Sequence, residues 1–114
     1  MSETQLSIRI ELETGGRIGP GRIALLEAIR KTGSLTAAAR SIQMSYRRAW
    51  RHVDELNKIL AKPVVTTSAG GFTRGSTKLT PIGEKIVVLY HSVEARTRAA
   101  GRTEFQALRK LTRS

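Results

Sequence analysis

The sequence predicts a mostly helical α+β fold with one small two-stranded sheet. Three features predict it: two closely spaced helices over residues 34–60, a strand, loop and strand over residues 63–80, and a long apolar helix beginning at residue 81. Two adjoining helices followed by a hairpin are the arrangement of a winged helix-turn-helix. We therefore expect one modest core and one such domain at residues 1–80, with a C-terminal helical segment at residues 81–114.

The first patterned segment is residues 6–13. Apolar side chains occupy every second position from Leu6 to Leu12, and polar side chains stand between them. This period of two is typical of a half-buried strand. Because the sequence offers few other strands, we expect residues 6–12 to join the wing sheet or to pair with their copy in a dimer.

A first helix is predicted from Pro20 to Thr32. Residues 19–21 prevent a much earlier start, and Gly33 can take the left-handed conformation that ends a helix. The apolar residues lie near one face, which predicts a supporting role in the core: Ile23, Leu26, Ala28 and Ile29.

Residues 34–60 predict two helices joined by a tight turn. Ser34 can cap the first helix, and residues 43–44 form the turn. Ser45 caps the second helix, which is predicted over residues 46–60. Its strongest apolar positions recur every three or four residues and mark the buried face: Ala49, Val53, Leu56 and Leu60.

The opposite face of the second helix points to function. At about 100° per residue, Arg47 and Arg51 lie almost directly away from the buried stripe, with Tyr46 at its boundary. Such side chains near the start of a helix can contact base edges in a DNA major groove. An ordinary solvated basic face is the alternative, and the preceding helix and turn make it the weaker one.

Residues 63–80 predict a strand, a glycine-rich loop and a return strand, which together make a wing. Arg74 lies in its loop and Lys78 on its return strand, where both could contact phosphates. The loop lacks the Gly-Lys-Ser/Thr ending of a nucleotide-binding loop. The alternative to a phosphate contact is that Arg74 is a mobile, solvated side chain. The expected phosphate contacts are Ser34, Thr36, Ser45, Arg48, Arg74 and Lys78.

Thr80 caps and Pro81 begins a long helix whose apolar residues recur at spacings of four and three. The stripe either packs on its own domain or pairs with the same helix of a second chain. A dimer is favoured because it presents two recognition helices to two half-sites. Gly101 interrupts the helix, and a capping-box pattern at Thr103 and Gln106 is expected to restart it. The residues predicted for dimerisation are Ile86, Leu89, Val93 and Ala100.

Composition narrows the classes of function. The chain has 20 Lys and Arg against 9 Asp and Glu, a net charge of +11, which suits a polyanionic partner such as nucleic acid or an anionic membrane surface. No apolar run approaches a membrane span and the N-terminus is unlike a signal peptide, so we expect a cytoplasmic protein. There is no cysteine, and His52 and His91 are not spaced as metal ligands. We therefore expect no catalytic site, cofactor or metal, and both histidines at the surface.

Several segments also resemble a known family. Thr32-Gly33-Ser34-Leu35 with the alanines at 37–39 is similar to the first motif helix of LysR-type winged helices. Residues 45–57 (Ser-Tyr-Arg-Arg-Ala-Trp at their start), residues 67–71 and Leu79-Thr80 with Gly83 resemble the N-terminal DNA-binding domain of the molybdate-responsive ModE regulators. This resemblance covers most of residues 5–95 and implies a DNA-binding winged helix. None of this chain remains for a molybdate-binding domain, so we do not expect a built-in oxyanion sensor. The expected alternatives are constitutive binding, control through abundance, or a signal from a separate effector-sensing partner.

The patterns and the resemblance together predict a dimeric, sequence-specific regulator of transcription that binds double-stranded DNA. Two other classes stay open: a protein-interaction module of a regulatory complex, and a chromosome-associated protein that is indifferent to sequence. Selection of bound duplexes from a random pool distinguishes them, because only the first class enriches a site.

Overall fold

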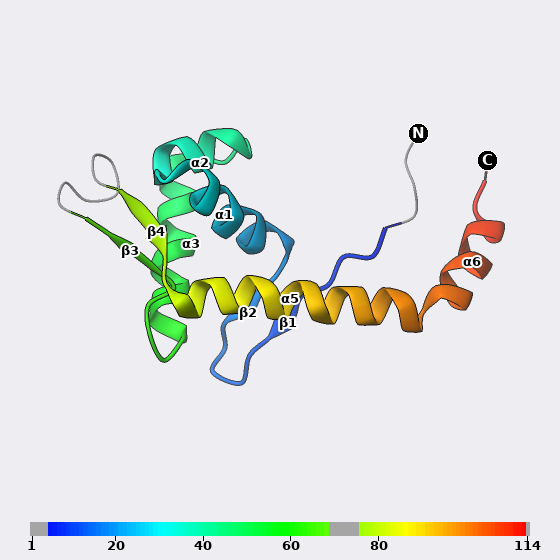
Figure 1. Cartoon of the computed structure of the whole chain (residues 1–114). Coiled ribbons are helices and arrows are strands. Elements are labelled where there is room, and N and C mark those ends of the chain that lie inside the picture. Colours follow the sequence, from blue (N-terminus) through cyan, green and yellow to red (C-terminus); the bar gives the residue numbers. More distant parts are fainter. Residues whose placement is uncertain (1–4, 69–75, 114) are drawn as a thin grey trace.

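The computed structural model describes residues 5–68 and 76–113, and shows a winged helical body from which one long helix extends (Figure 1). The molecule measures 53 × 31 × 21 Å along its principal axes. In chain order the elements are β1 (Ile10–Glu11), β2 (Arg17–Ile18), α1 (Pro20–Thr32), α2 (Leu35–Ser41), α3 (Tyr46–Ile59), β3 (Val65–Thr67), β4 (Thr77–Leu79), α5 (Pro81–Ala100) and α6 (Arg102–Leu111).

The core lies where α1, α2 and α3 pack together in the body. Apolar side chains that recur at helical spacing are buried on the inner face of each helix. Burial of each large one stabilises the fold by about 1.5–3 kcal/mol. α1 begins at Pro20 and ends at Gly33, whose φ of 71° is left-handed, as predicted. The mostly helical fold with small hairpins confirms the predicted fold class. The largest fully buried side chains in this core are Leu25, Leu26, Ile29, Leu35, Val53, Leu56 and Val64.

The N-terminal segment is paired differently from the prediction. β1 does not join the wing sheet; it pairs antiparallel with β2, with Ile10 opposite Ile18. A tight turn allows this, because Gly15 has a φ of 95° and the Leu12 N–H donates to the Gly16 carbonyl at 2.7 Å. The sequence did not reveal β2, since two residues are too few to show a period. The predicted alternation survives as burial, with residues 6, 8, 10 and 12 half-buried and their neighbours exposed.

The wing is the hairpin of β3 and β4, with Val65 opposite Leu79 and Thr67 opposite Thr77. It is fixed to the body at two points. The Thr77 N–H donates to the Gly33 carbonyl at 2.9 Å, and the Asn57 Oδ1 atom of α3 accepts from the Val64 N–H at 2.8 Å. Residues 69–75, including the predicted contact Arg74, lie outside the described part of the chain.

α5 runs from the body to the far end of the molecule (Figure 1). Thr80 caps it by accepting from the Gly83 N–H at 3.1 Å. Gly83, Val87 and Tyr90 are buried against the body, and the Tyr90 hydroxyl donates to the Ile8 carbonyl at 2.8 Å. The first half of α5 therefore packs on its own domain, which was one of the two uses expected for its apolar stripe.

α6 begins at Arg102, directly after Gly101, which has no side chain to cap it. The predicted capping box is therefore wrong: Thr103 already lies inside the helix, because Gly101 itself takes the N-cap position. All α6 side chains except the half-buried Phe105 are exposed. Within residues 5–68 and 76–113, no helix has the length and apolar character needed to cross a membrane.

Candidate nucleic-acid interface

The helix-turn-helix is held by three local interactions. The Ser34 Oγ accepts from the Ala37 N–H at 3.1 Å and caps α2. Gln43 has a φ of 57°, and this left-handed residue turns the chain between the two helices. The Ser45 Oγ then accepts from the Arg48 N–H at 3.1 Å and caps α3. The caps and the turn lie where the sequence predicted them.

α3 has a buried face and an open face. Ala49, Val53 and Leu56 are fully buried, whereas Arg47 and Arg51 are exposed on the other side of the helix. Neither arginine side chain forms a hydrogen bond or ion pair with the residues that the structure describes. Two guanidinium groups therefore project side by side from the first turns of α3, with their donors free to meet a ligand.

The rest of the open face changes character along the helix. The half-buried Asp54 and the exposed Lys58 form an i,i+4 ion pair at 3.0 Å, which offsets the negative charge one turn beyond Arg51. On the flank nearer the wing, Tyr46 is 37% and Trp50 is 43% exposed. This flank offers flat apolar surface beside the arginines.

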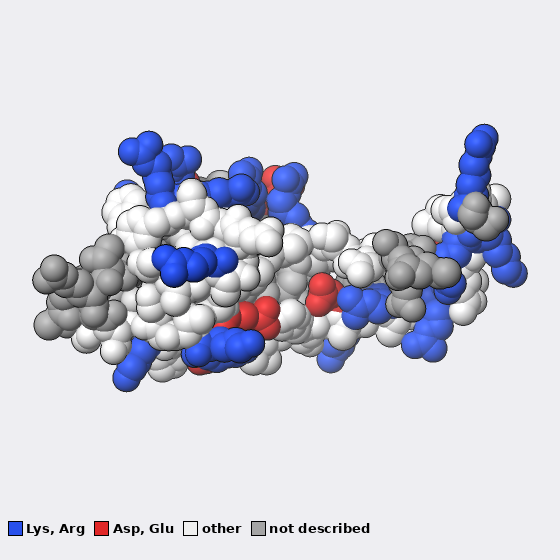
Figure 2. Space-filling model, turned by 90° about the horizontal axis from the view of Figure 1, so that it is seen from above, with Lys and Arg blue, Asp and Glu red and all other residues white. Residues whose placement is uncertain are grey.

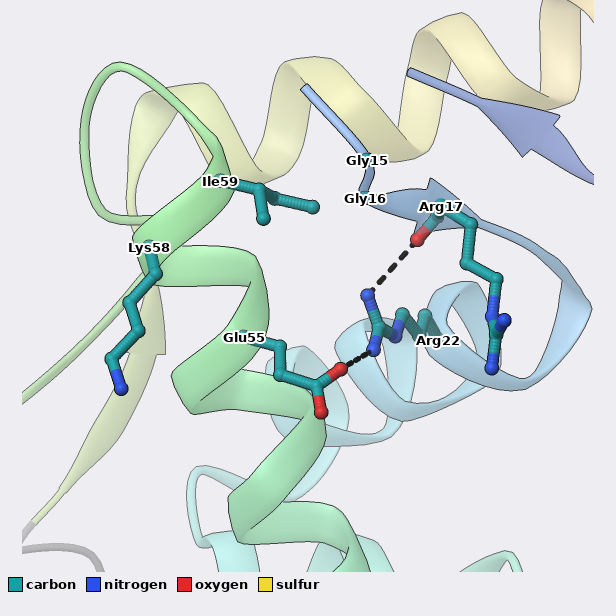
Figure 3. Close-up of a pocket in the computed structure, with 7 residues that line it drawn as sticks. All are labelled: Gly15, Gly16, Arg17, Arg22, Glu55, Lys58 and Ile59. Atoms are coloured by element: carbon teal, nitrogen blue, oxygen red, sulfur yellow. Dashed lines mark hydrogen bonds and ion pairs between the residues drawn. The ribbon is translucent and has the colours of Figure 1, made fainter. Parts of the chain in front are cut away.

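The opposite flank of α3 is tied to α1 by Arg22, which is only 7% exposed. Its guanidinium donates to the Arg17 carbonyl at 3.0 Å and forms an ion pair with Glu55, and Figure 3 shows it between these two groups. Its Nε–H donates to His52 Nδ1 at 3.0 Å. One buried side chain thus connects α1, the N-terminal hairpin and the recognition helix. The sequence patterns did not single out Arg22, because its partners are distant in the chain.

His52 is half-buried rather than a surface group as predicted. Burial, followed by the nearby Arg22 and Arg48 charges, lowers the pKa of His52 below its ordinary value of 6.5. The ring is therefore neutral at neutral pH. Because its Nδ1 accepts from Arg22, its proton lies on Nε2.

The predicted phosphate contacts within the described ranges lie at the starts of α2 and α3 and on β4. Ser34 and Thr36 are half-buried at the start of α2, while Arg48 and Lys78 are exposed. The Ser34 and Ser45 hydroxyls accept from backbone N–H groups, and each keeps a hydrogen to donate. A hollow of about 410 Å³ also opens here. Its lining includes Met44 of the predicted turn and Arg40, which the sequence patterns did not single out.

The charge is spread unevenly over the surface. Figure 2 shows Lys and Arg side chains projecting from the helix-turn-helix end of the molecule and gathering again around α6 at the far end. Acidic side chains are fewer and lie mostly between these two regions. Within the described ranges, no group of three or more His, Asp or Glu side chains is placed so that it could hold a metal ion.

The four residues predicted for dimerisation have different surroundings. Ile86 is half-buried and packs against the domain's own core. Leu89 and Val93 are 53% and 43% exposed, and Ala100 is exposed near the end of α5. Val88 adds a further exposed apolar side chain at 64%. On α5, the apolar surface available to a second chain is therefore centred on residues 88–93.

Residues 21–84 match the family described as bacterial regulatory helix-turn-helix protein, lysR family. The chain is 50% identical over 82 residues to the molybdenum-pterin-binding protein MopB of Rhodobacter capsulatus, covering 72% of this chain and 30% of that protein. It is 37% identical over 102 residues to the molybdenum transport protein ModE of Azotobacter vinelandii, covering 88% of this chain and 38% of that protein.

The fold is also similar to a solved structure, the crystal structure of the CbnR_DBD–DNA complex. The match has a TM-score of 0.59 at 19% identity and covers 76% of this chain and 95% of the other. At 19% identity, this match supports the fold and nothing further. The chain spans about a third of the length of the two curated relatives above.

Proposed function

The chain belongs to the bacterial regulatory helix-turn-helix proteins of the LysR family, and from this membership we propose that it binds double-stranded DNA through α3 and regulates transcription. The observation that carries the proposal is the open face of α3. Arg47 and Arg51 are exposed, lie opposite the buried Val53 and Leu56, and have no partner among the described residues. A bacterial regulator acts on the chromosome, so a cytoplasmic location is part of this proposal.

In the proposed complex the first two turns of α3 enter the major groove. Arg47 and Arg51, with Tyr46 beside them, contact base edges, and a bidentate arginine contact to guanine contributes about 1–3 kcal/mol of discrimination. Phosphates on either side are held by the remaining predicted contacts, which are Ser34, Thr36, Ser45, Arg48, Arg74 and Lys78.

We further propose that two chains act together. The exposed Leu89 and Val93 of α5 supply the apolar contact between the chains, with Ile86 and Ala100 at its margins. A two-fold dimer places two recognition helices on half-sites about one DNA turn, roughly 34 Å, apart. The operator is then expected to be a palindrome.

The test is selection of bound duplexes from a random pool at near-physiological salt. The wild-type protein is expected to enrich a palindromic site. R47A/R51A should lose this enrichment but keep salt-sensitive background binding, because the phosphate contacts remain.

R109A/K110A, on α6, is the matched control, since it removes two positive charges away from the helix-turn-helix. It should enrich the same site as the wild-type protein. Enrichment of that site by R47A/R51A would overturn the assignment of base contacts. Saturable binding without any enriched site would favour the sequence-indifferent chromosome protein, and the absence of duplex binding would favour the protein-interaction module.

A further inference from the structure

A second hollow lies on the flank of α3 that faces away from the wing. It has a volume of about 160 Å³ and is enclosed by the N-terminal hairpin, the start of α1 and one side of α3. Each of these segments contributes basic side chains, and none of the lining residues is acidic. The lining residues are Arg9, Arg17, Arg22, Arg48 and His52, with Gly19 and Gly21.

The charges around this hollow are not all equivalent. Arg22 is offset by its ion pair with Glu55, and Arg9 lies 3.8 Å from the exposed Glu11. Arg17 and Arg48 side chains have no ion-pair partner in the part of the chain that the structure describes. In Figure 3 the Arg17 guanidinium is directed away from Glu55. The Glu55 carboxylate therefore does not neutralise the charge of Arg17.

His52 lies among the same arginines. Burial lowers the pKa of this ring most, and the Arg22, Arg48 and Arg17 charges lower it further, against a single raising charge from Glu55. His52 also keeps an Nε2–H donor, because its Nδ1 is occupied by Arg22. Nearby, α1 starts without an acidic residue in its first turn. The hollow therefore combines several hydrogen-bond donors with unbalanced positive charge, which is the chemistry that binds a phosphate oxyanion.

We propose that this hollow binds a phosphate group, and that in the complex with DNA it takes a backbone phosphate on the side of the major groove opposite the wing. The contact with a DNA backbone phosphate rests on the proposed function. A helix in a major groove has a phosphate backbone on each side. Arg48 and His52 lie about 100° around α3 from Arg47 and Arg51, and Asn57, which holds the wing, lies on the other flank. The hairpin arginines Arg9 and Arg17 would thus extend the contact surface beyond the helix-turn-helix and the wing.

The DNA test uses R9Q/R17Q, which removes two exposed side chains from the hairpin and leaves α3 intact. Binding to the selected duplex is measured between 50 and 200 mM salt. The plot of log K against log salt should become shallower by about 0.9 for each phosphate that the variant no longer neutralises, or about 1.8 for a dimer. The ranking of duplex sequences should stay the same. R96Q/R102Q, which removes two exposed arginines from α5 and α6, is the charge-matched control and should keep the wild-type slope.

A second measurement needs no DNA. Inorganic phosphate is titrated into the wild-type protein at constant ionic strength while the His52 ring is followed by NMR. Phosphate in the hollow should raise the pKa of His52 saturably, and R9Q/R17Q should weaken this response. Because this readout is independent of duplex binding, it still decides the proposal if the protein fails to bind DNA.

The outcomes separate the two sources of phosphate. A shallower salt slope for R9Q/R17Q than for the control identifies a backbone phosphate. A wild-type slope together with a phosphate-dependent His52 pKa identifies a free anion. If R9Q/R17Q has the slope of its control and phosphate leaves the His52 titration unchanged, the hollow is not a phosphate site.

Discussion

Replacing Arg22 by glutamine is expected to lower the free energy of unfolding by about 2–4 kcal/mol. The arginine is 7% exposed and makes three contacts, with His52, the Arg17 carbonyl and Glu55. Two contacts to neutral groups contribute about 0.5–1.5 kcal/mol each and the one to the carboxylate about 1.5–3 kcal/mol. The sum is reduced because Glu55, whose side chain is 47% exposed, regains water when its partner is removed.

Urea and thermal unfolding followed by circular dichroism measure this destabilisation. For a chain of this size, about 4 °C per kcal/mol gives a decrease in Tm of roughly 8–16 °C. The matched control is R30Q, also on α1. Arg30 bonds Glu84 at 2.9 Å, but both side chains are 45% exposed, so its removal should cost about 0.2–1 kcal/mol. Equal destabilisation by R22Q and R30Q would refute the claim that burial makes the Arg22 contacts strong.

Three further predictions concern α5 and the start of α1. G83A should destabilise the domain by about 2 kcal/mol in urea unfolding, because its new Cβ would meet the Val64 carbonyl group; G21A, with open space around it, should be neutral or stabilising. Hydrogen bonds to two glutamates raise the pKa of His91 in the folded protein. The protonated ring therefore stabilises the fold below the pKa of the unfolded chain, about 6.5, and this stabilisation is lost as the pH rises through the pKa of the folded state. H91A should therefore lower the free energy of unfolding by about 0.2–1 kcal/mol more at pH 5.5 than at pH 8.5. A loss of stability that does not depend on pH would contradict this. L89E/V93E should sediment as a folded monomer where the wild-type protein sediments as a dimer, and an unchanged mass would exclude the α5 contact.

Much of the fold follows from patterns that span only a few residues. The caps at Ser34, Ser45 and Thr80 and the left-handed Gly33 lie where the sequence predicted them. A cap depends on a side chain and a backbone N–H three residues away, so no distant part of the chain is needed to predict it. The predicted α3 also has the expected buried and open faces, since the helical period alone sets them.

Predictions were wrong where a local pattern had two possible continuations. The alternation at residues 6–12 predicted burial on one side but did not identify the partner strand, because β2 is only two residues long. The pattern at Thr103 and Gln106 resembles a capping box, yet the helix starts earlier, after Gly101. His52 looked like a surface histidine because the sequence did not show that Arg22 would pack beside it.

The sequence by itself determined the helices from α1 to α5, the caps at Ser34, Ser45 and Thr80, the two strands of the wing and the face of α3 that carries Arg47 and Arg51. Only the tertiary structure brought Arg22 to Glu55, 33 residues away, and gathered arginines from the hairpin, α1 and α3 around one hollow. The physical reason is the range of the interactions. Helix periods, turns and caps arise between residues a few positions apart, whereas contacts between elements depend on how the helices cross, which the packing of the whole core decides.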